Sequence, residues 1–81
     1  MRVIEKEMLK AIQEKKDWIK DNTQVKQYGL FCEILIFGNH IADYFYADVP
    51  FVNTNRKTFA DHPTRTTKSR LRALGVNYKN F

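Results

Sequence analysis

Hydrophobic residues near the start of the chain recur at helical spacing. Between residues 2 and 20 they stand three, four or seven positions apart while polar side chains fill the other side; the apolar set is Ile4, Met8, Ala11, Ile12, Trp18 and Ile19. A 3.6-residue period of this kind is typical of an amphipathic helix with one buried side. The pattern predicts one helix over residues 2 to 20 that covers a sheet.

The period shortens to two residues after Asn22. Thr23 to Gln27 alternates as a short strand, and Gly38-Asn39 separates two runs of aromatic and branched residues, Leu30 to Phe37 and His40 to Ala47. A glycine-containing pair between two such runs is typical of a β-hairpin with a two-residue turn. We therefore expect Phe37 to pair with His40.

This pairing divides the hairpin side chains between two faces, because alternate residues of a strand point to opposite sides. The first face holds Cys32, Ile34, Ile36, Ile41, Asp43 and Phe45. The second face holds Phe31, Glu33, Leu35, Phe37, His40, Ala42, Tyr44 and Tyr46. With the N-terminal helix on the first face, the second is an aromatic surface that needs a cover or a partner.

Weaker patterns follow Pro50. Phe51-Val52 fits an edge strand, where a neighbouring proline is tolerated, and residues 56 to 61 fit a short helix. A further helix is expected from an N-cap at Thr64 or Thr66 to Gly75, and residues 76 to 81 alternate weakly as a final strand. The predicted fold class is α+β: an N-terminal helix packed on a small antiparallel β-meander, followed by a C-terminal basic helix, in a single domain over residues 1 to 81.

All of the excess positive charge lies in the last third of the chain. Residues 56 to 81 contain seven Lys or Arg and one acid, a net charge of +6, whereas residues 1 to 55 contain seven bases and eight acids. Such asymmetry favours a polyanionic partner, either nucleic acid or the acidic surface of a protein.

The C-terminal helix holds the main candidate contacts for that partner. Arg65, Lys68 and Arg72 lie within about 60° of one another at helical spacing, and hydroxyls and free N–H groups at the helix start can also bind phosphate oxygens. The candidate residues are Arg65, Lys68, Arg72, Arg70, Thr66 and Thr67, with Arg56 and Lys57 from the preceding helix. The alternatives are a helix whose threonines cap it and whose basic residues are merely solvated, and a helix-turn-helix over residues 56 to 74 that lacks the usual supporting third helix.

The aromatic face is a second candidate surface. Its Phe31, Phe37, Tyr44 and Tyr46 could stack unpaired bases. They could equally anchor a protein, with Tyr44, Tyr46 and Phe37 as the expected anchors. The alternative, which we favour for a chain of 81 residues, is that the C-terminal helices pack on this face and form a second small core.

Neither catalysis nor metal binding is indicated. His40 and His62 stand at no spacing typical of metal ligands, and the predicted faces place Glu33 and Asp43 on opposite sides of the hairpin. We expect a non-enzymatic protein that uses no metal and no cofactor. The lone cysteine, Cys32, fits a reducing cytosol, and no segment has the length and hydrophobicity of a membrane span.

Several segments resemble a family of small proteins of tailed bacteriophages. They are Val3-Ile4-Glu5, Asn22-Thr23-x-Val25, Gly38-Asn39-His40-Ile41-Ala42 and Pro63-Thr64-x-Thr66-Thr67-Lys68-Ser69-Arg70-Leu71-x-Ala73-Leu74-Gly75. The resemblance implies a viral origin and the cytosol of the host bacterium. It implies no particular activity and no functional residue.

Two hypotheses follow for a small phage protein that acts by stoichiometric binding. The first is an inhibitor of a host nucleic-acid-handling or defence complex, such as an anti-CRISPR protein, whose partner is a host protein or ribonucleoprotein complex. The second is an accessory protein that binds DNA or RNA through the basic C-terminal helix.

Overall fold

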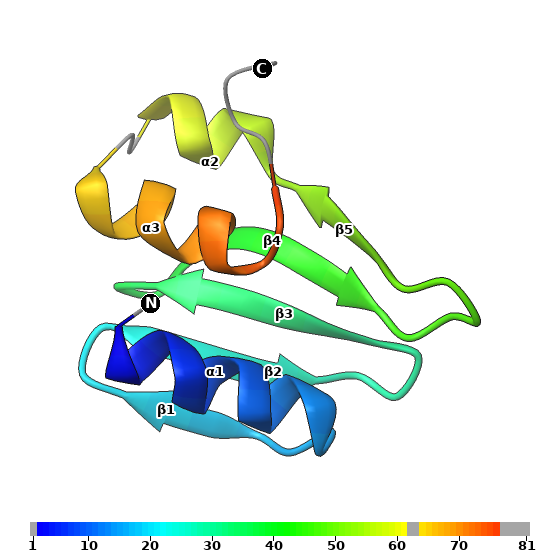
Figure 1. Cartoon of the computed structure of the whole chain (residues 1–81). Coiled ribbons are helices and arrows are strands. Elements are labelled where there is room, and N and C mark those ends of the chain that lie inside the picture. The colour runs from blue at the N-terminus through cyan, green and yellow to red at the C-terminus, as the bar shows by residue number, and fades with distance from the viewer. Residues whose placement is uncertain (1, 62–63, 77–81) are drawn as a thin grey trace.

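The chain folds into one antiparallel sheet with helices before and after it (Figure 1). The computed structural model describes residues 2–61 and 64–76. Helix α1 (Val3–Gln13) is followed by strands β1 (Trp18–Lys20), β2 (Thr23–Gln27), β3 (Phe31–Ile36), β4 (Asn39–Phe45) and β5 (Phe51–Thr54), and then by helices α2 (Arg56–Asp61) and α3 (Arg65–Ala73). The strands lie in chain order, each antiparallel to the next. The α+β class and the meander are confirmed.

The first helix is shorter than its apolar spacing predicts. It ends at Gln13, and Lys15 turns the chain with a left-handed φ of 55°. Trp18 then lies opposite Val25 in the first strand pair, so Trp18 and Ile19 belong to β1 rather than to the helix. The strand is tied back to α1 by an ion pair of 2.8 Å between Lys20 Nζ and Glu7 Oε2. Apolar residues at positions 18 and 19 fit both a helical stripe and a short strand, and for this reason the spacing predicted a helix that extends too far.

The hairpin turn lies one residue earlier than predicted. Ile36 pairs with Asn39, so the turn residues are Phe37 and Gly38, with φ of 51° and 77°. Two consecutive positive φ angles define the type I′ turn, whose twist matches that of the flanking strands. The predicted pair of Phe37 with His40 does not form, and Phe37 is left 73% exposed.

A β-bulge in β4 reverses the faces predicted for the second half of this strand. Leu35 pairs with His40 but Ile34 pairs with Ala42, so Ile41 is an extra residue on β4. Ile41 and Ala42 are both buried, and from Ala42 onward every β4 side chain points to the side opposite to the prediction. Tyr44 therefore lies on the helix-covered face, whereas Asp43 and Phe45 lie on the other.

Both long helices pack on the same face of the sheet. Met8 of α1, Ile34 of β3 and Leu71 of α3 belong to one buried cluster, and Figure 1 shows α1 and α3 on the same side. The prediction that the C-terminal helices form a second core on the aromatic face is therefore wrong. The predicted edge strand and short helix are present as β5 and α2. The predicted final strand lies largely outside the described residues.

Candidate functional site

The side chains on the sheet face away from α1 and α3 form three rows across the strands, and we call this surface the open face. The register places Lys26, Glu33, Asp43 and Asn53 in the middle row. Gln24, Leu35 and His40 form the row nearest the hairpin turn, and Phe31, Phe45 and Phe51 form the row at the opposite end. No helix in the described part of the chain packs on these rows, so they are available to a partner.

Tyr28 extends the row of Phe31, Phe45 and Phe51 into a stack of four aromatic rings, which we call the aromatic row. Ring centroids are 5.3 Å apart for Tyr28 and Phe31, 5.3 Å for Phe31 and Phe45, and 4.7 Å for Phe45 and Phe51. Neighbouring planes are inclined by 12°, 29° and 10°, which is stacked geometry at the spacing of adjacent strands. The rings therefore turn their faces to one another and their edges to the surface. The end members are well exposed, Tyr28 at 47% and Phe51 at 53%.

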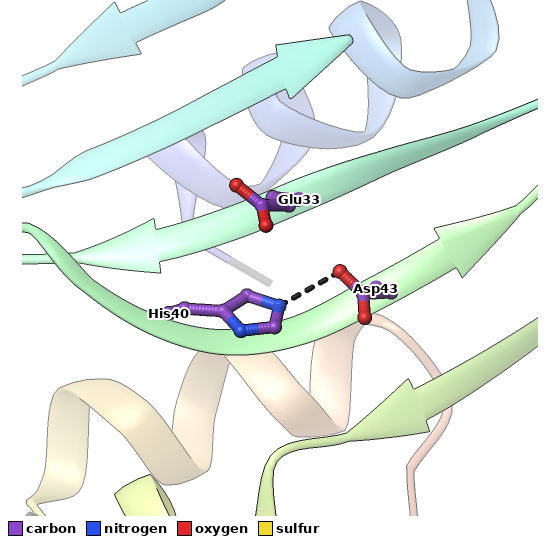
Figure 2. A group of neighbouring side chains, drawn as sticks. All are labelled: Glu33, His40 and Asp43. Carbon is purple, nitrogen blue, oxygen red and sulfur yellow. Dashed lines mark hydrogen bonds and ion pairs between the residues drawn. The ribbon is translucent and has the colours of Figure 1, made fainter. Parts of the chain in front are cut away.

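The middle row and the row nearest the hairpin turn together contain a polar cluster of Glu33, His40 and Asp43 (Figure 2). His40 Nε2 lies 2.7 Å from Asp43 Oδ1, and Glu33 lies directly opposite Asp43 in the strand pair. His40 Nδ1 is 3.4 Å from Asn55 Nδ2, so the Asn55 amide donates to the ring and Nε2 donates to Asp43. The prediction that Glu33 and Asp43 point to opposite faces is wrong, because the bulge at Ile41 moves Asp43 to the open face.

Helix α3 places its candidate residues in two different environments. The Thr64 hydroxyl caps the helix by accepting the N–H of Thr67, which is 2% exposed. Thr67 thus faces inward, as does Leu71. The outward side carries the predicted stripe: Arg65 and Arg72 are exposed, and Lys68 and Thr66 are partly exposed. On α2, Arg56 and Lys57 are also exposed.

Arg70 is enclosed by the fold and is not available to a partner. It is 2% exposed and joins α3 to the rest of the protein. Its Nη1 donates to Glu5 Oε2 at 2.8 Å and its Nε to Thr23 Oγ1 at 3.0 Å. Burial opposes ionisation of Glu5, but hydrogen bonds from Ser69 and Arg70 outweigh it and lower the pKa of the Glu5 carboxyl. The candidate contact Arg70 is thus a structural cation.

Two of the three predicted aromatic anchors lie on the covered face. Tyr44 and Tyr46 are half-buried against the core, and the Tyr46 hydroxyl donates to the Ile12 carbonyl at 2.9 Å. Burial raises the pKa of Tyr46 and, on the same face, that of Cys32. Phe37 is exposed, but at the hairpin turn.

Sequence reasoning missed Phe45, Phe51 and Tyr28 as members of the aromatic row. The adjacent apolar pair Ile41-Ala42 was the available signal for Phe45, since two consecutive buried residues break strand alternation. Phe51 was correctly assigned to an edge strand. Once the bulge moves Phe45 to the open face, pairing of this edge strand with β4 places Phe51 beside Phe45.

Taken together, the fold and its surfaces define a small α+β protein with one covered sheet face, one open aromatic face and a cationic helix. The chain matches the family model described as Kyanoviridae Gp96 protein over residues 1–81, and it belongs to that family of cyanophage proteins. It is therefore a phage protein, as its sequence motifs imply. The comparisons with curated proteins and with solved structures gave no match. None of the described helices is long and apolar enough to cross a bilayer.

Proposed function

We propose that this phage protein is a non-enzymatic binding protein that docks on a host protein through its open face and thereby inhibits the complex to which that host protein belongs. The observation that supports the proposal is the aromatic row. Four rings whose edges reach the surface form a contiguous apolar strip, and such strips on small soluble proteins are typical of protein interfaces. The host complexes we consider first are those that handle nucleic acid or act in defence against phages.

Ring orientation favours a protein over nucleic acid as the partner of this face. Unpaired bases stack on aromatic rings whose faces are free. Here the faces of Phe31 and Phe45 are covered by neighbouring rings, and the ammonium of Lys26 lies 5.9 Å from the centre of the Tyr28 ring. The neighbouring row also presents Glu33 and Asp43, whose negative charges repel phosphate.

The expected partner is a protein with an apolar patch bordered by basic or hydrogen-bonding groups. The apolar patch would pack against the ring edges, and its basic border would meet Glu33 and Asp43. Tyr28 and Phe51, the exposed ends of the row, are the expected anchors because each buries a large ring surface on association.

The test is a pull-down from nuclease-treated lysate of the host bacterium with matched variants. We expect the wild-type chain to retain a protein partner, and Tyr28→Ser with Phe51→Ser to lose it. Val3→Ser is the control, since Val3 is 67% exposed on α1 and away from the open face, and it should retain the partner. Equal recovery with the wild-type chain and the open-face double variant would contradict the proposal.

Direct binding of DNA or RNA is the second candidate, and the exposed stripe of α3 favours it. Arg65, Lys68 and Arg72 belong to α3, and this helix lies on the side of the sheet opposite to the open face with its acidic residues (Figure 1). A partner recovered only without nuclease, and lost with Arg65→Glu and Lys68→Glu, would support this second function.

A further inference from the structure

The cluster on the open face combines three side chains that are common metal ligands. The ligand atoms of Glu33, His40 and Asp43 all lie within 4.8 Å of one another, and Figure 2 shows the Glu33 carboxylate on β3 beside the His40 and Asp43 pair on β4. We propose that these three residues form a binding site for a divalent transition-metal ion. The site shares Glu33 and Asp43 with the surface proposed for the partner, but metal binding itself requires no partner.

The distances are close to those that a bound ion requires. Ions such as Zn²⁺ bind imidazole nitrogen and carboxylate oxygen at about 2.0 to 2.2 Å, which places neighbouring ligand atoms about 3 to 3.5 Å apart. His40 Nε2 and Asp43 Oδ1 are now joined by a hydrogen bond of 2.7 Å, and a bound ion would replace the proton between them and require the two atoms to move apart slightly. The Glu33 carboxylate needs only side-chain rotation to complete the set, because the strand register fixes its backbone directly opposite Asp43.

Charge also favours a cation at this position. Two carboxylates directly opposite one another on adjacent strands repel, and an ion between them removes that repulsion. Within the described part of the chain, the Glu33 side chain makes no ion pair and no hydrogen bond. Lys26, its neighbour on β2, turns its ammonium toward the Tyr28 ring instead.

The ligand types select the class of metal. One imidazole with two carboxylates suits Zn²⁺, Mn²⁺, Fe²⁺ or Co²⁺, whereas Mg²⁺ and Ca²⁺ prefer oxygen ligands alone. The buried thiol of Cys32 lies on the opposite face and is not part of the set. Three protein ligands leave coordination positions that point away from the sheet, where water or a group from a partner can bind.

Metal binding at His40 Nε2 should change the hydrogen bonds that Asn55 makes at the start of α2. The ion takes the place of the Nε2 proton that Asp43 now accepts, so the remaining ring proton sits on Nδ1 and requires an acceptor. Asn55 can supply its amide oxygen only by turning the amide, and that oxygen now accepts the N–H of Thr58 at 3.2 Å. Occupancy of the site and the cap of α2 are therefore coupled.

The experiment is a titration of the untagged full chain with Co²⁺, followed by visible absorption, and with Zn²⁺, followed by calorimetry. We expect one ion per chain, and at least about tenfold weaker binding in each of Glu33→Gln, His40→Gln and Asp43→Asn, since even residues that only orient a ligand change affinity by about tenfold or more. His62→Gln and Asp48→Asn remove the other histidine and an acid outside the cluster, and they should bind as the wild type does. NMR should show the Thr58 amide shifting on addition of Zn²⁺.

Two results would overturn the site. One is wild-type affinity no higher than that of His40→Gln. The other is a cobalt spectrum that changes with His62→Gln instead of with the three cluster variants. Circular dichroism of each variant confirms that it is folded, and Glu33→Gln is the safest of them because it removes repulsion rather than a contact. These measurements need no partner, so their outcome is separate from that of the pull-down.

Discussion

Arg70 shows how one residue of a basic helix can have a role different from that of its neighbours. Its guanidinium reaches two elements, through Glu5 of α1 and Thr23 of β2, and also Asn22 in the turn before β2. Glu5 in turn accepts the backbone N–H of Arg2 at 3.2 Å, so the same carboxylate caps α1 and holds α3. A buried charge is stable only when its hydrogen bonds are satisfied, and no buried polar side-chain atom lacks a partner among the described residues.

Replacement of Arg70 should therefore lower the free energy of unfolding far more than replacement of its exposed neighbours. Arg70→Met leaves Glu5 buried without its cation, and we expect a loss of about 3 to 5 kcal/mol in the free energy of unfolding. Arg65→Met, on the exposed side of the same helix, should change it by less than about 0.5 kcal/mol. Urea denaturation measures both. Similar losses in the two variants would show that the network contributes little.

The buried ion pair of Glu5 and Arg70 also predicts how stability depends on pH. The folded state lowers the pKa of Glu5 below its ordinary value of 4.5, so the ionised carboxylate stabilises the fold. This contribution is complete above about pH 4.5 and is lost as the pH falls through the lower, folded-state pKa. The difference in unfolding free energy between the wild type and Glu5→Gln should therefore shrink from pH 6 to pH 3. A constant difference across that range would mean that the pKa of Glu5 is the same in both states.

At the scale of elements, the sequence predicts those features that depend on short-range pattern. The alternation of β3 correctly placed Cys32, Ile34 and Ile36 inside. Of the two N-caps expected for α3, Thr64 is the one that forms, and Gly75 follows the C-cap with a left-handed φ of 85°. These assignments succeed because burial and capping are decided within a few residues.

The candidate site depends on the β-bulge at Ile41, which strict strand alternation does not predict. One extra residue in β4 moves Asp43 and Phe45 to the open face, and with them the polar cluster and the aromatic row. Whether a strand absorbs an extra residue depends on the segments beside it: the Ile41 carbonyl accepts the N–H of Asn55, which directly follows β5, at 2.8 Å. Alternation alone therefore predicted the correct strand with the wrong faces.

The hairpin turn offers a test at this scale. Phe37 adopts a left-handed conformation that costs an ordinary residue about 1 to 2 kcal/mol, whereas asparagine accepts it readily and Asn-Gly is the preferred type I′ pair. Phe37→Asn should therefore leave the protein as stable as the wild type or raise the unfolding free energy by up to about 1 kcal/mol. Thermal denaturation would measure this. A fall in the midpoint would show that the exposed Phe37 ring has a stabilising contact that its 73% exposure hides.

At the scale of the whole molecule, the two candidate surfaces lie on opposite sides of the sheet. The cationic stripe belongs to the helical layer, and the aromatic row belongs to the open face (Figure 1). A single flat partner surface can therefore contact one of them but not both. This separation makes the two functional hypotheses distinguishable by charge substitution on α3 alone.

Salt dependence measured with Arg65→Glu and Lys68→Glu is the decisive comparison. Both side chains point outward from α3, so the double variant should keep the thermal midpoint of the wild type. If a host protein binds the open face, apolar contacts dominate: the substitutions and added salt should change mainly the association rate, and dissociation should stay nearly constant. If nucleic acid binds α3, log K should fall with log salt with a slope of about three for a three-residue stripe, and the double variant should lose most of that slope. We expect the first behaviour. Micromolar or tighter binding of bare DNA or RNA at about 150 mM salt, removed by the double variant, would assign the function to α3 instead.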